Sequence, residues 1–212
     1  MPGILSFRRW RRFNLARPAL RAAFVLAMSV GISTDASAQQ LRLEFSPANT
    51  TVNFALGDLL HTVRGSFRLK QGTVEYNFST ATVTGALVID ASSGKSGNRI
   101  RDRKMHRQIL ESARYSEITF RPDRIEGEVA PSGSSTVKVH GIFSVHGADH
   151  ELTMPVRVQV FPDHWTAETH FTVPYVKWGI KNPSAFFLRV SESVEIAVHA
   201  TGGRPLAANG QH

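Results

Sequence analysis

The sequence predicts an all-β protein: a closed antiparallel β-barrel of about eight strands with one short helix. Three observations support this fold class. Apolar and polar residues alternate over most of the chain between Leu41 and Ala200, which is typical of half-buried strands. The intervals between the alternating rows are short, so neighbouring rows are expected to pair as antiparallel hairpins. One longer segment, Asn98–Arg114, lacks alternation and carries helix-forming residues. Closure into a barrel would remove the sheet edges that such strands otherwise expose.

The first 38 residues have the pattern of a secretory signal peptide. A basic stretch, Arg8–Arg21, precedes a short apolar run, Ala22–Ser33, and the small residues Ala36-Ser37-Ala38 then offer a cleavage site. The apolar run is too short to span a bilayer. We therefore expect a Sec-type signal peptide over residues 1–38, a mature chain that begins near Gln39, and a periplasmic or secreted bacterial protein.

The charge of the chain is concentrated in this leader. The whole sequence has a net charge of +8, but residues 1–38 hold six arginines and one aspartate, so the remainder carries 19 basic and 16 acidic side chains. A net charge of +3 gives no reason to expect nucleic acid as a partner. The chain has no cysteine, which excludes disulfides, thiolate chemistry and an acylated-cysteine anchor. We expect one domain over residues 39–202 and a disordered tail over residues 203–212.

Alternating rows account for the first half of this domain. The parity of the apolar positions changes after Gly72, which predicts a bulge or bend within one long strand. Between the first two rows, Asp58–Thr62 is expected to form a single helical turn. The rows are Val52, Phe54 and Leu56; Val63, Phe67 and Leu69; Val74, Tyr76 and Phe78; and Val83, Leu87 and Ile89.

The segment Asn98–Arg114 is expected to be the helix, with Asn98 as its N-cap, before alternation resumes. Turn residues at Gly147–Asp149 and Pro162–His164 then separate consecutive rows. These rows are Val137, Val139, Phe143 and Val145; Leu152, Met154, Val156, Val158 and Val160; Trp165, Ala167, Phe171 and Val173; and Val194, Ile196 and Val198.

Fragments that resemble catalytic or metal-binding motifs are incomplete. Ser92–Lys95 has the spacing of a Ser-x-x-Lys nucleophile, but it lies in a Ser/Gly loop and its companion elements are missing. Three histidines, His140, His146 and His150, cluster near one hairpin and are interpreted as surface imidazoles, with a surface metal site as the weaker alternative. No catalytic residue, metal or cofactor is predicted.

The densest basic cluster after the leader lies in the predicted helix. It consists of Arg99, Arg101, Arg103, Lys104 and Arg107. The cluster is either a solvated helix face or a surface that attracts an anionic head group or a membrane surface.

An ordered set of segments resembles the YceI-like family of periplasmic lipid- and polyisoprenoid-binding proteins. The resemblance covers about Leu41–Gly202 and implies an elongated, lipocalin-like barrel with a long apolar ligand, an isoprenoid chain or a fatty-acyl lipid, in its lumen. It implies no catalytic residue. The sequence departs from the family pattern at Ser116 and at Pro174–Gly179. The matching segments are Thr62–Phe67, Gly97–Asp102, Tyr115–Phe120, Val139–Gly147 and Leu152–Val156.

On this reading, large apolar side chains line the lumen and polar ones at its mouth hold the head group. The expected partner is a long-chain lipid, and a homodimer is left open. A small outer-membrane barrel and an enzyme of unknown reaction are the alternatives. The expected lumen residues are Phe54, Phe67, Tyr76, Leu87, Ile89, Phe120, Phe143, Val158, Phe171, Trp178 and Phe187; the expected head-group residues are Arg99, Arg101, Asp102, His106 and Lys177.

Overall fold

The computed structural model describes residues 40–57, 61–184, 190–204 and 206–207, and all of them belong to one compact unit, Ala36–His212. Several predictions lie wholly or largely outside the described residues: the signal peptide, the helical turn at Asp58–Thr62, the lumen residue Phe187 and most of the tail. Two tail residues, Leu206–Ala207, form the short strand β10.

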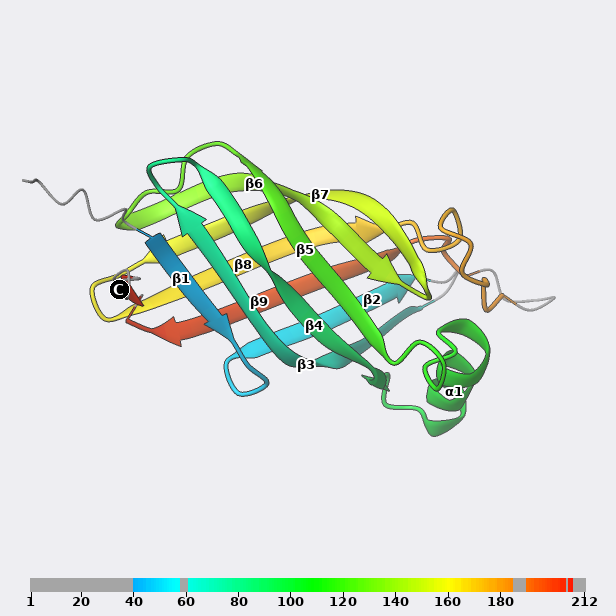
Figure 1. Cartoon of the computed structure of the whole chain (residues 1–212). Coiled ribbons are helices and arrows are strands. Elements are labelled where there is room, and N and C mark those ends of the chain that lie inside the picture. Colours follow the sequence, from blue (N-terminus) through cyan, green and yellow to red (C-terminus); the bar gives the residue numbers. More distant parts are fainter. Residues whose placement is uncertain (1–39, 58–60, 185–189, 205, 208–212) are drawn as a thin grey trace, which may run out of the picture. The chain divides into compact units, whose positions relative to one another are not determined.

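The architecture is a single antiparallel sheet that closes on itself (Figure 1). Neighbouring strands pair in the order β3-β2-β9-β8-β7-β6-β5-β4, and the pairing of β4 with β3 completes the ring. The eight strands from β2 to β9 therefore form the predicted closed barrel. They are β2 (Thr50–Gly57), β3 (Thr62–Asn77), β4 (Thr82–Lys95), β5 (Glu117–Glu126), β6 (Gly133–Val145), β7 (Ala148–Val160), β8 (His164–Val173) and β9 (Val194–Gly203).

Strand β1 (Gln40–Phe45) lies outside this ring. It pairs with the second half of β3, where Leu41 lies opposite Tyr76, whereas β2 pairs with the first half, where Val52 lies opposite Phe67. Strand β10 pairs in turn with β1. The long strand β3 thus carries β1 and β2 along one edge and β4 along the other.

The change of parity within β3 is confirmed as an irregularity in its pairing. The β3–β4 register shifts between Ser66 and Arg68 and again between Leu69 and Gln71, just before Gly72. In the second shift, two residue steps of β3, from Leu69 to Gln71, lie opposite a single step of β4, from Ile89 to Val88, so the side chains of β3 that follow point to the other face. Phe67 from the first half and Tyr76 from the second half consequently both face the interior.

The helix is shorter than the predicted Asn98–Arg114. Asn98 caps it as expected, since its side-chain oxygen accepts hydrogen bonds from the amides of Ile100 (3.0 Å) and Arg101 (3.1 Å). An α-helical turn, α1 (Arg99–Lys104), continues into a π-helical turn, η1 (Met105–Ile109). The chain then leaves the helix because Glu111 has a φ of +45°, a left-handed conformation that interrupts the helical hydrogen bonds. Neither helical segment among the described residues is long and apolar enough to cross a membrane.

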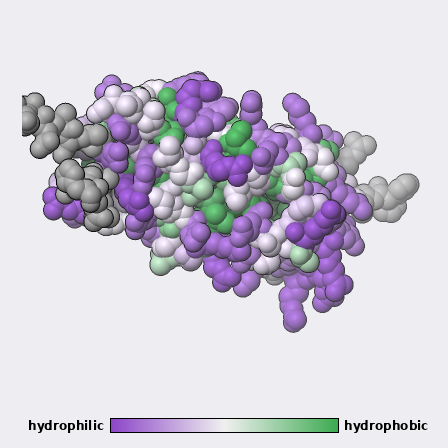
Figure 2. Space-filling model, in the orientation of Figure 1, coloured by the Kyte–Doolittle hydropathy of each residue, from purple (hydrophilic) through white to green (hydrophobic). Residues whose placement is uncertain are grey.

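The interior contains two apolar clusters, one toward each end of the barrel. The first surrounds Leu41, Tyr76 and Trp165 and includes residues of β1. The second surrounds Phe143 and Tyr175 and lies nearer to η1, with Ile109 packed against it. In Figure 2 the outer face in view is mostly hydrophilic, with apolar side chains in separate spots. Of the large apolar side chains that the structure describes, only Ile100 and Phe161 are exposed, so the barrel is apolar inside and mostly polar outside.

Candidate ligand-binding cavity

A cavity of about 510 Å³ occupies the end of the barrel next to α1. Its wall combines inward-facing residues of the strands with residues of the helical segment and of the chain between β8 and β9. Most of this wall is apolar. It consists of Phe54, Leu56, Val63, Phe67, Ile100, Met105, Ile109, Leu110, Ile118, Phe143, Val145, Val173, Tyr175, Ile180, Pro183, Val190, Val194 and Ile196, together with four polar residues, Ser96, Asn98, Arg101 and Lys104.

The four polar residues come from one short stretch, residues 96–104, which comprises the link after β4 and α1, so the cavity has a single polar side. Arg101 donates through Nε to the Ser96 hydroxyl oxygen (2.7 Å) and through Nη2 to the Ser96 carbonyl oxygen (2.7 Å). Lys104 Nζ donates to the carbonyl oxygen of Pro183 (3.1 Å). These bonds hold two cationic side chains at the cavity and leave further N–H groups of both free to bind a ligand.

Asp102 holds the start of the helix rather than lining the cavity. Its Oδ1 accepts hydrogen bonds from the Ser96 amide (2.8 Å) and from the Ser96 hydroxyl. Partial burial on its own raises the pKa of the Asp102 carboxyl, but the two Ser96 bonds and the charge of Arg101 outweigh it and leave the pKa below its ordinary value. Asp102 is therefore ionised at neutral pH and keeps Ser96 in place for Arg101.

His106 also has a structural position. Its Nε2 lies 2.9 Å from the Gly94 carbonyl oxygen, and its Nδ1 lies 3.1 Å from the Ser112 hydroxyl. The carbonyl can only accept, so Nε2 donates, and in the neutral ring Nδ1 then accepts from the Ser112 hydroxyl. His106 thereby joins η1 to the end of β4 and to the residues that follow the helix.

Tyr175 places a hydroxyl in the otherwise apolar part of the wall. The hydroxyl donates to the Ser191 carbonyl oxygen (2.6 Å), which connects the two ends of the segment between β8 and β9. Burial, with a smaller contribution from the negative charge of Glu192, raises the pKa of Tyr175 to about 12. The side chain is therefore a neutral donor that is already satisfied within the protein.

A second, smaller cavity of about 110 Å³ lies further along the barrel. Four of the predicted lumen residues line it: Tyr76, Leu87, Phe120 and Val158. Three others, Phe54, Phe67 and Phe143, line the large cavity. The lumen is therefore partly filled by its own side chains and partly hollow.

The remaining described lumen residues line neither cavity. Phe171 and Trp178 pack in the second apolar cluster, with ring centroids 6.4 Å and 5.6 Å from that of Phe143. Trp178 also stacks on His150, with a centroid distance of 4.3 Å and an interplanar angle of 3°. Ile89 is half-buried on β4. Phe171 and Trp178 therefore belong to the apolar packing around the large cavity without bordering it.

Of the five predicted head-group residues, only Arg101 lines the large cavity. Asp102 and His106 make the structural bonds described above, and Arg99 and Lys177 are exposed side chains outside the cavity wall. Ser96, Asn98 and Lys104 do line it and were not predicted as head-group residues. Lys104 belongs to the basic cluster and Asn98 is the helix cap, so both were visible in the sequence, but neither feature indicates which way the helix faces.

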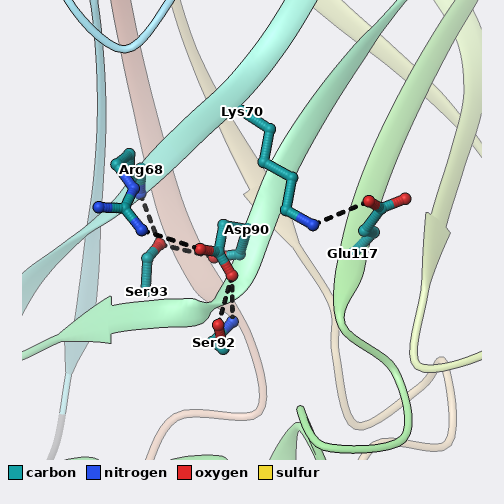
Figure 3. A network of polar contacts seen from close by, with 6 residues as sticks. All are labelled: Arg68, Lys70, Asp90, Ser92, Ser93 and Glu117. Carbon is teal, nitrogen blue, oxygen red and sulfur yellow. Dashed lines mark hydrogen bonds and ion pairs between the residues drawn. The ribbon is translucent and has the colours of Figure 1, made fainter.

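A polar network on the outer wall fixes the irregular part of β3 and β4 (Figure 3). Asp90 accepts hydrogen bonds from the Ser92 amide (3.0 Å) and hydroxyl (2.5 Å) and from Arg68 Nη2 (3.1 Å). The Ser92 hydroxyl bond, aided by Arg68 and opposed by burial, lowers the pKa of Asp90. Beside it, Lys70 pairs with Glu117 at 2.9 Å, which ties β3 to β5. The network holds the last residues of β4, which lead directly to Ser96.

The three histidines of the β6–β7 hairpin do not converge on one point. His140 Nδ1 lies 2.6 Å from Asp123 Oδ1, and His146 packs on Tyr115 at a centroid distance of 4.5 Å. His150 instead stacks on Trp178. All three side chains are half-buried, and Nε2 of both His146 and His150 is shielded from solvent, so they are not the solvated surface imidazoles that the sequence predicted. Among the described residues, no group of at least three His, Cys, Asp or Glu side chains could hold a metal ion.

An antiparallel barrel that is closed around an apolar cavity, with a few polar groups at one side, is the arrangement of lipocalin-like ligand-binding barrels. The chain belongs to the YceI-like domain family, which its residues 43–202 match. The resemblance found in the sequence is thereby confirmed.

Solved structures share this fold at low sequence identity. The chain is similar to BcnA of Burkholderia cenocepacia, with a TM-score of 0.60, 17% identity, and coverage of 72% of this chain and 96% of that one. It is similar to a polyisoprenoid-binding domain from Saccharophagus degradans, with a TM-score of 0.56, 15% identity, and coverage of 79% and 100%. It is also similar to a Campylobacter jejuni YceI protein, with a TM-score of 0.57, 11% identity, and coverage of 69% and 88%. No curated protein matches the chain.

Proposed function

We propose that the chain binds a long-chain amphiphile, a polyisoprenoid or fatty-acyl lipid, and carries it in the periplasm. The observation that carries the proposal is the apolar cavity of about 510 Å³, with its polar side at Arg101 and Lys104. Small-molecule sites have volumes of roughly 300–1,000 Å³ and combine an apolar wall with a few polar groups. The apolar chain would occupy the cavity, and the head group would lie near the two cations.

The energetics permit affinity to come from the apolar chain alone. Burial of one methylene stabilises by about 0.8 kcal/mol, so four isoprene units give roughly 16 kcal/mol before costs. Association and ordering cost about 4–15 kcal/mol. A micromolar complex needs about −8 kcal/mol, which a chain of this size reaches when the costs are moderate. The cations then set orientation rather than affinity.

The identity of the ligand as an isoprenoid is supported by one solved relative, which is described as a polyisoprenoid-binding domain. The periplasmic location rests on the predicted signal peptide over residues 1–38. A homodimer stays a prediction.

The described polar side chains at the cavity favour binding over catalysis. Arg101, Lys104 and Tyr175 each bond to backbone or hydroxyl groups of the wall. The Ser96 hydroxyl of the wall donates to the Asp102 carboxylate, but it also accepts a bond from Arg101, so this contact holds the start of the helix in place. An outer-membrane barrel carries apolar side chains on its outer face. The outer face of this barrel is mostly polar, so the outer-membrane alternative is disfavoured.

Lipid extraction tests the proposal. The full chain is produced with its own leader in a bacterial host, purified from the periplasmic fraction without detergent, extracted with organic solvent and analysed by mass spectrometry. We expect one isoprenoid or fatty-acyl species at near-stoichiometric amount. Repeated absence of lipid, together with no uptake of added isoprenoids or fatty-acyl probes, would overturn the proposal. Sequencing of the purified N-terminus tests the expected cleavage before Gln39.

A further inference from the structure

The most exposed large apolar side chain of the described structure lies at the rim of the cavity. Ile100 is 78% exposed, yet it also forms part of the cavity wall. The other large apolar side chain that stands out as exposed is Phe161, at 37%, and its ring stacks on His164. Ile100 has no such cover among the described residues, so an apolar group points into water directly beside the cavity.

The surroundings of Ile100 are strongly basic. Between positions 95 and 107 the chain has six Lys or Arg residues and one acidic residue, Asp102, which is held by Ser96. Arg99, Arg103 and Arg107 are exposed, and no described carboxylate lies within ion-pair distance of them. Figure 2 shows hydrophilic side chains gathered over this segment.

Basic residues on the strands differ from those of the helical segment, because several of them are paired with carboxylates. Arg42 pairs with Glu75 across β1 and β3, Lys70 pairs with Glu117, and Arg121 lies 3.4 Å from Asp149. The positive charge of the helical segment is therefore a local excess and not a property of the whole surface.

The geometry of the helix places these features together. Residues three and four positions apart share one face of a helix, so Arg103 and Lys104 flank Ile100. Met105 and Ile109 of the same segment line the cavity. The segment thus has a cavity side and a basic outer side, with an apolar residue where the two meet. Binding to an anionic bilayer surface is strengthened both by the apolar area that enters it and by each Lys or Arg close to it, and Ile100 and its basic neighbours offer both.

We propose that α1 and η1 dock the protein on an anionic phospholipid surface. Ile100 enters the head-group region, Arg99, Arg103 and Arg107 contact lipid phosphates, and the cavity rim then faces the bilayer. A lipid chain could pass between bilayer and cavity without crossing water. Only this transfer step rests on the proposed function, since docking requires the surface alone.

Vesicle flotation tests the docking. The purified full chain is mixed at low ionic strength with vesicles of phosphatidylglycerol and phosphatidylcholine in equal parts, or of phosphatidylcholine alone. We expect binding to the anionic vesicles, weaker binding to the neutral ones, and loss of binding at high salt because salt screens surface charge. The variant Ile100→Ser, and separately the triple variant Arg99→Gln, Arg103→Gln and Arg107→Gln, should each lower the affinity about tenfold or more.

A matched triple variant controls for net charge. Arg124→Gln, Lys138→Gln and Arg157→Gln remove the same charge from β5, β6 and β7, away from the helical segment. This control should keep most of the binding. The inference is overturned if the unaltered chain does not bind anionic vesicles, if it binds neutral vesicles equally well, or if the control triple lowers binding as much as the helix triple. Thermal melting of each variant verifies folding.

The two proposals fail separately. If lipid is extracted from the protein but vesicles are not bound, only the docking is wrong. If vesicles are bound through Ile100 but no lipid is found or taken up, docking stands and the proposed function falls.

Discussion

Lys104 Nζ donates a hydrogen bond of 3.1 Å to the carbonyl oxygen of Pro183. Lys104 belongs to α1 and Pro183 to the chain between β8 and β9, and both residues line the large cavity. The bond therefore joins two parts of the cavity wall that are far apart in the sequence. A ligand that enters between them would require this bond to break, so it is expected to influence the rate of exchange.

Lys104→Met is expected to speed ligand release. The variant removes the bond to Pro183 but keeps a long unbranched side chain. Loss of the hydrogen bond costs about 1 kcal/mol, which corresponds to roughly fivefold faster ligand release. Stopped-flow dissociation of a fluorescent fatty-acyl probe measures this rate. The control is Arg103→Met, because Arg103 is an exposed neighbour without a described bonding partner. Equal rates for both variants would contradict the prediction.

Val63→Trp is expected to fill the large cavity. Val63 lines that cavity, so the larger side chain would occupy ligand space and weaken probe binding by about tenfold or more. Arg64→Trp is the matched control, since Arg64 is the next residue of β3 and is exposed on the outer face. Probe titration should separate the two variants, and unchanged affinity of Val63→Trp would place the binding site elsewhere.

Asp90→Asn is expected to destabilise the barrel by about 1–3 kcal/mol, because Asp90 is buried and its carboxylate accepts bonds from Ser92 and Arg68. The pKa of Asp90 is lowered in the folded state, so its contribution is present above the ordinary pKa of 3.8 and is lost as pH falls through the folded value. Denaturant melts between pH 7 and pH 3 should therefore show a larger loss of stability in the unaltered chain than in the variant. Parallel pH profiles would refute this role.

Tyr175 is expected to ionise about two pH units later than a free tyrosine, because burial raises its pKa from 10.0 to about 12. Because the pKa of Tyr175 is higher in the folded than in the unfolded state, its contribution to the free energy of unfolding is fully present below pH 10 and declines as pH rises toward 12. Ultraviolet titration of the phenolate, compared with Tyr175→Phe, isolates this side chain. A tyrosine at position 175 that titrates near pH 10 would show that the hydroxyl is not buried against Ser191.

Gly141→Ala is expected to destabilise the fold by about 1–3 kcal/mol through overpacking. A Cβ at this position would lie 2.3 Å from the Arg121 carbonyl oxygen and 2.8 Å from Pro122 Cα, and these backbone atoms of β5 cannot move aside independently. Gly57→Ala is the control, because a Cβ there would have no atom within 4 Å. In thermal melting, the midpoint temperature should be lower for Gly141→Ala and nearly unchanged for Gly57→Ala.

The strands could be predicted from the sequence because the alternation of apolar and polar residues is a local pattern. In a pleated strand successive side chains face opposite sides, so the alternation of Val137, Val139, Phe143 and Val145 already shows which side of β6 is buried. The bulge near Gly72 follows from the same rule, since only an irregularity lets the apolar parity change. The cap at Asn98 is equally local. These features determined the fold class and the family resemblance.

The cavity and its polar side depended on the tertiary structure. Whether an apolar row fills a barrel or borders a space depends on the balance between the volume that the closed sheet encloses and the side chains from all strands, which no single segment contains. Phe143 and Phe171 have the same pattern in the sequence, yet only Phe143 borders the large cavity. Likewise, the sequence shows a basic helix, but only the packing of that helix on the barrel determines that Arg101 and Lys104 line the cavity while Arg99 and Arg103 are exposed to solvent.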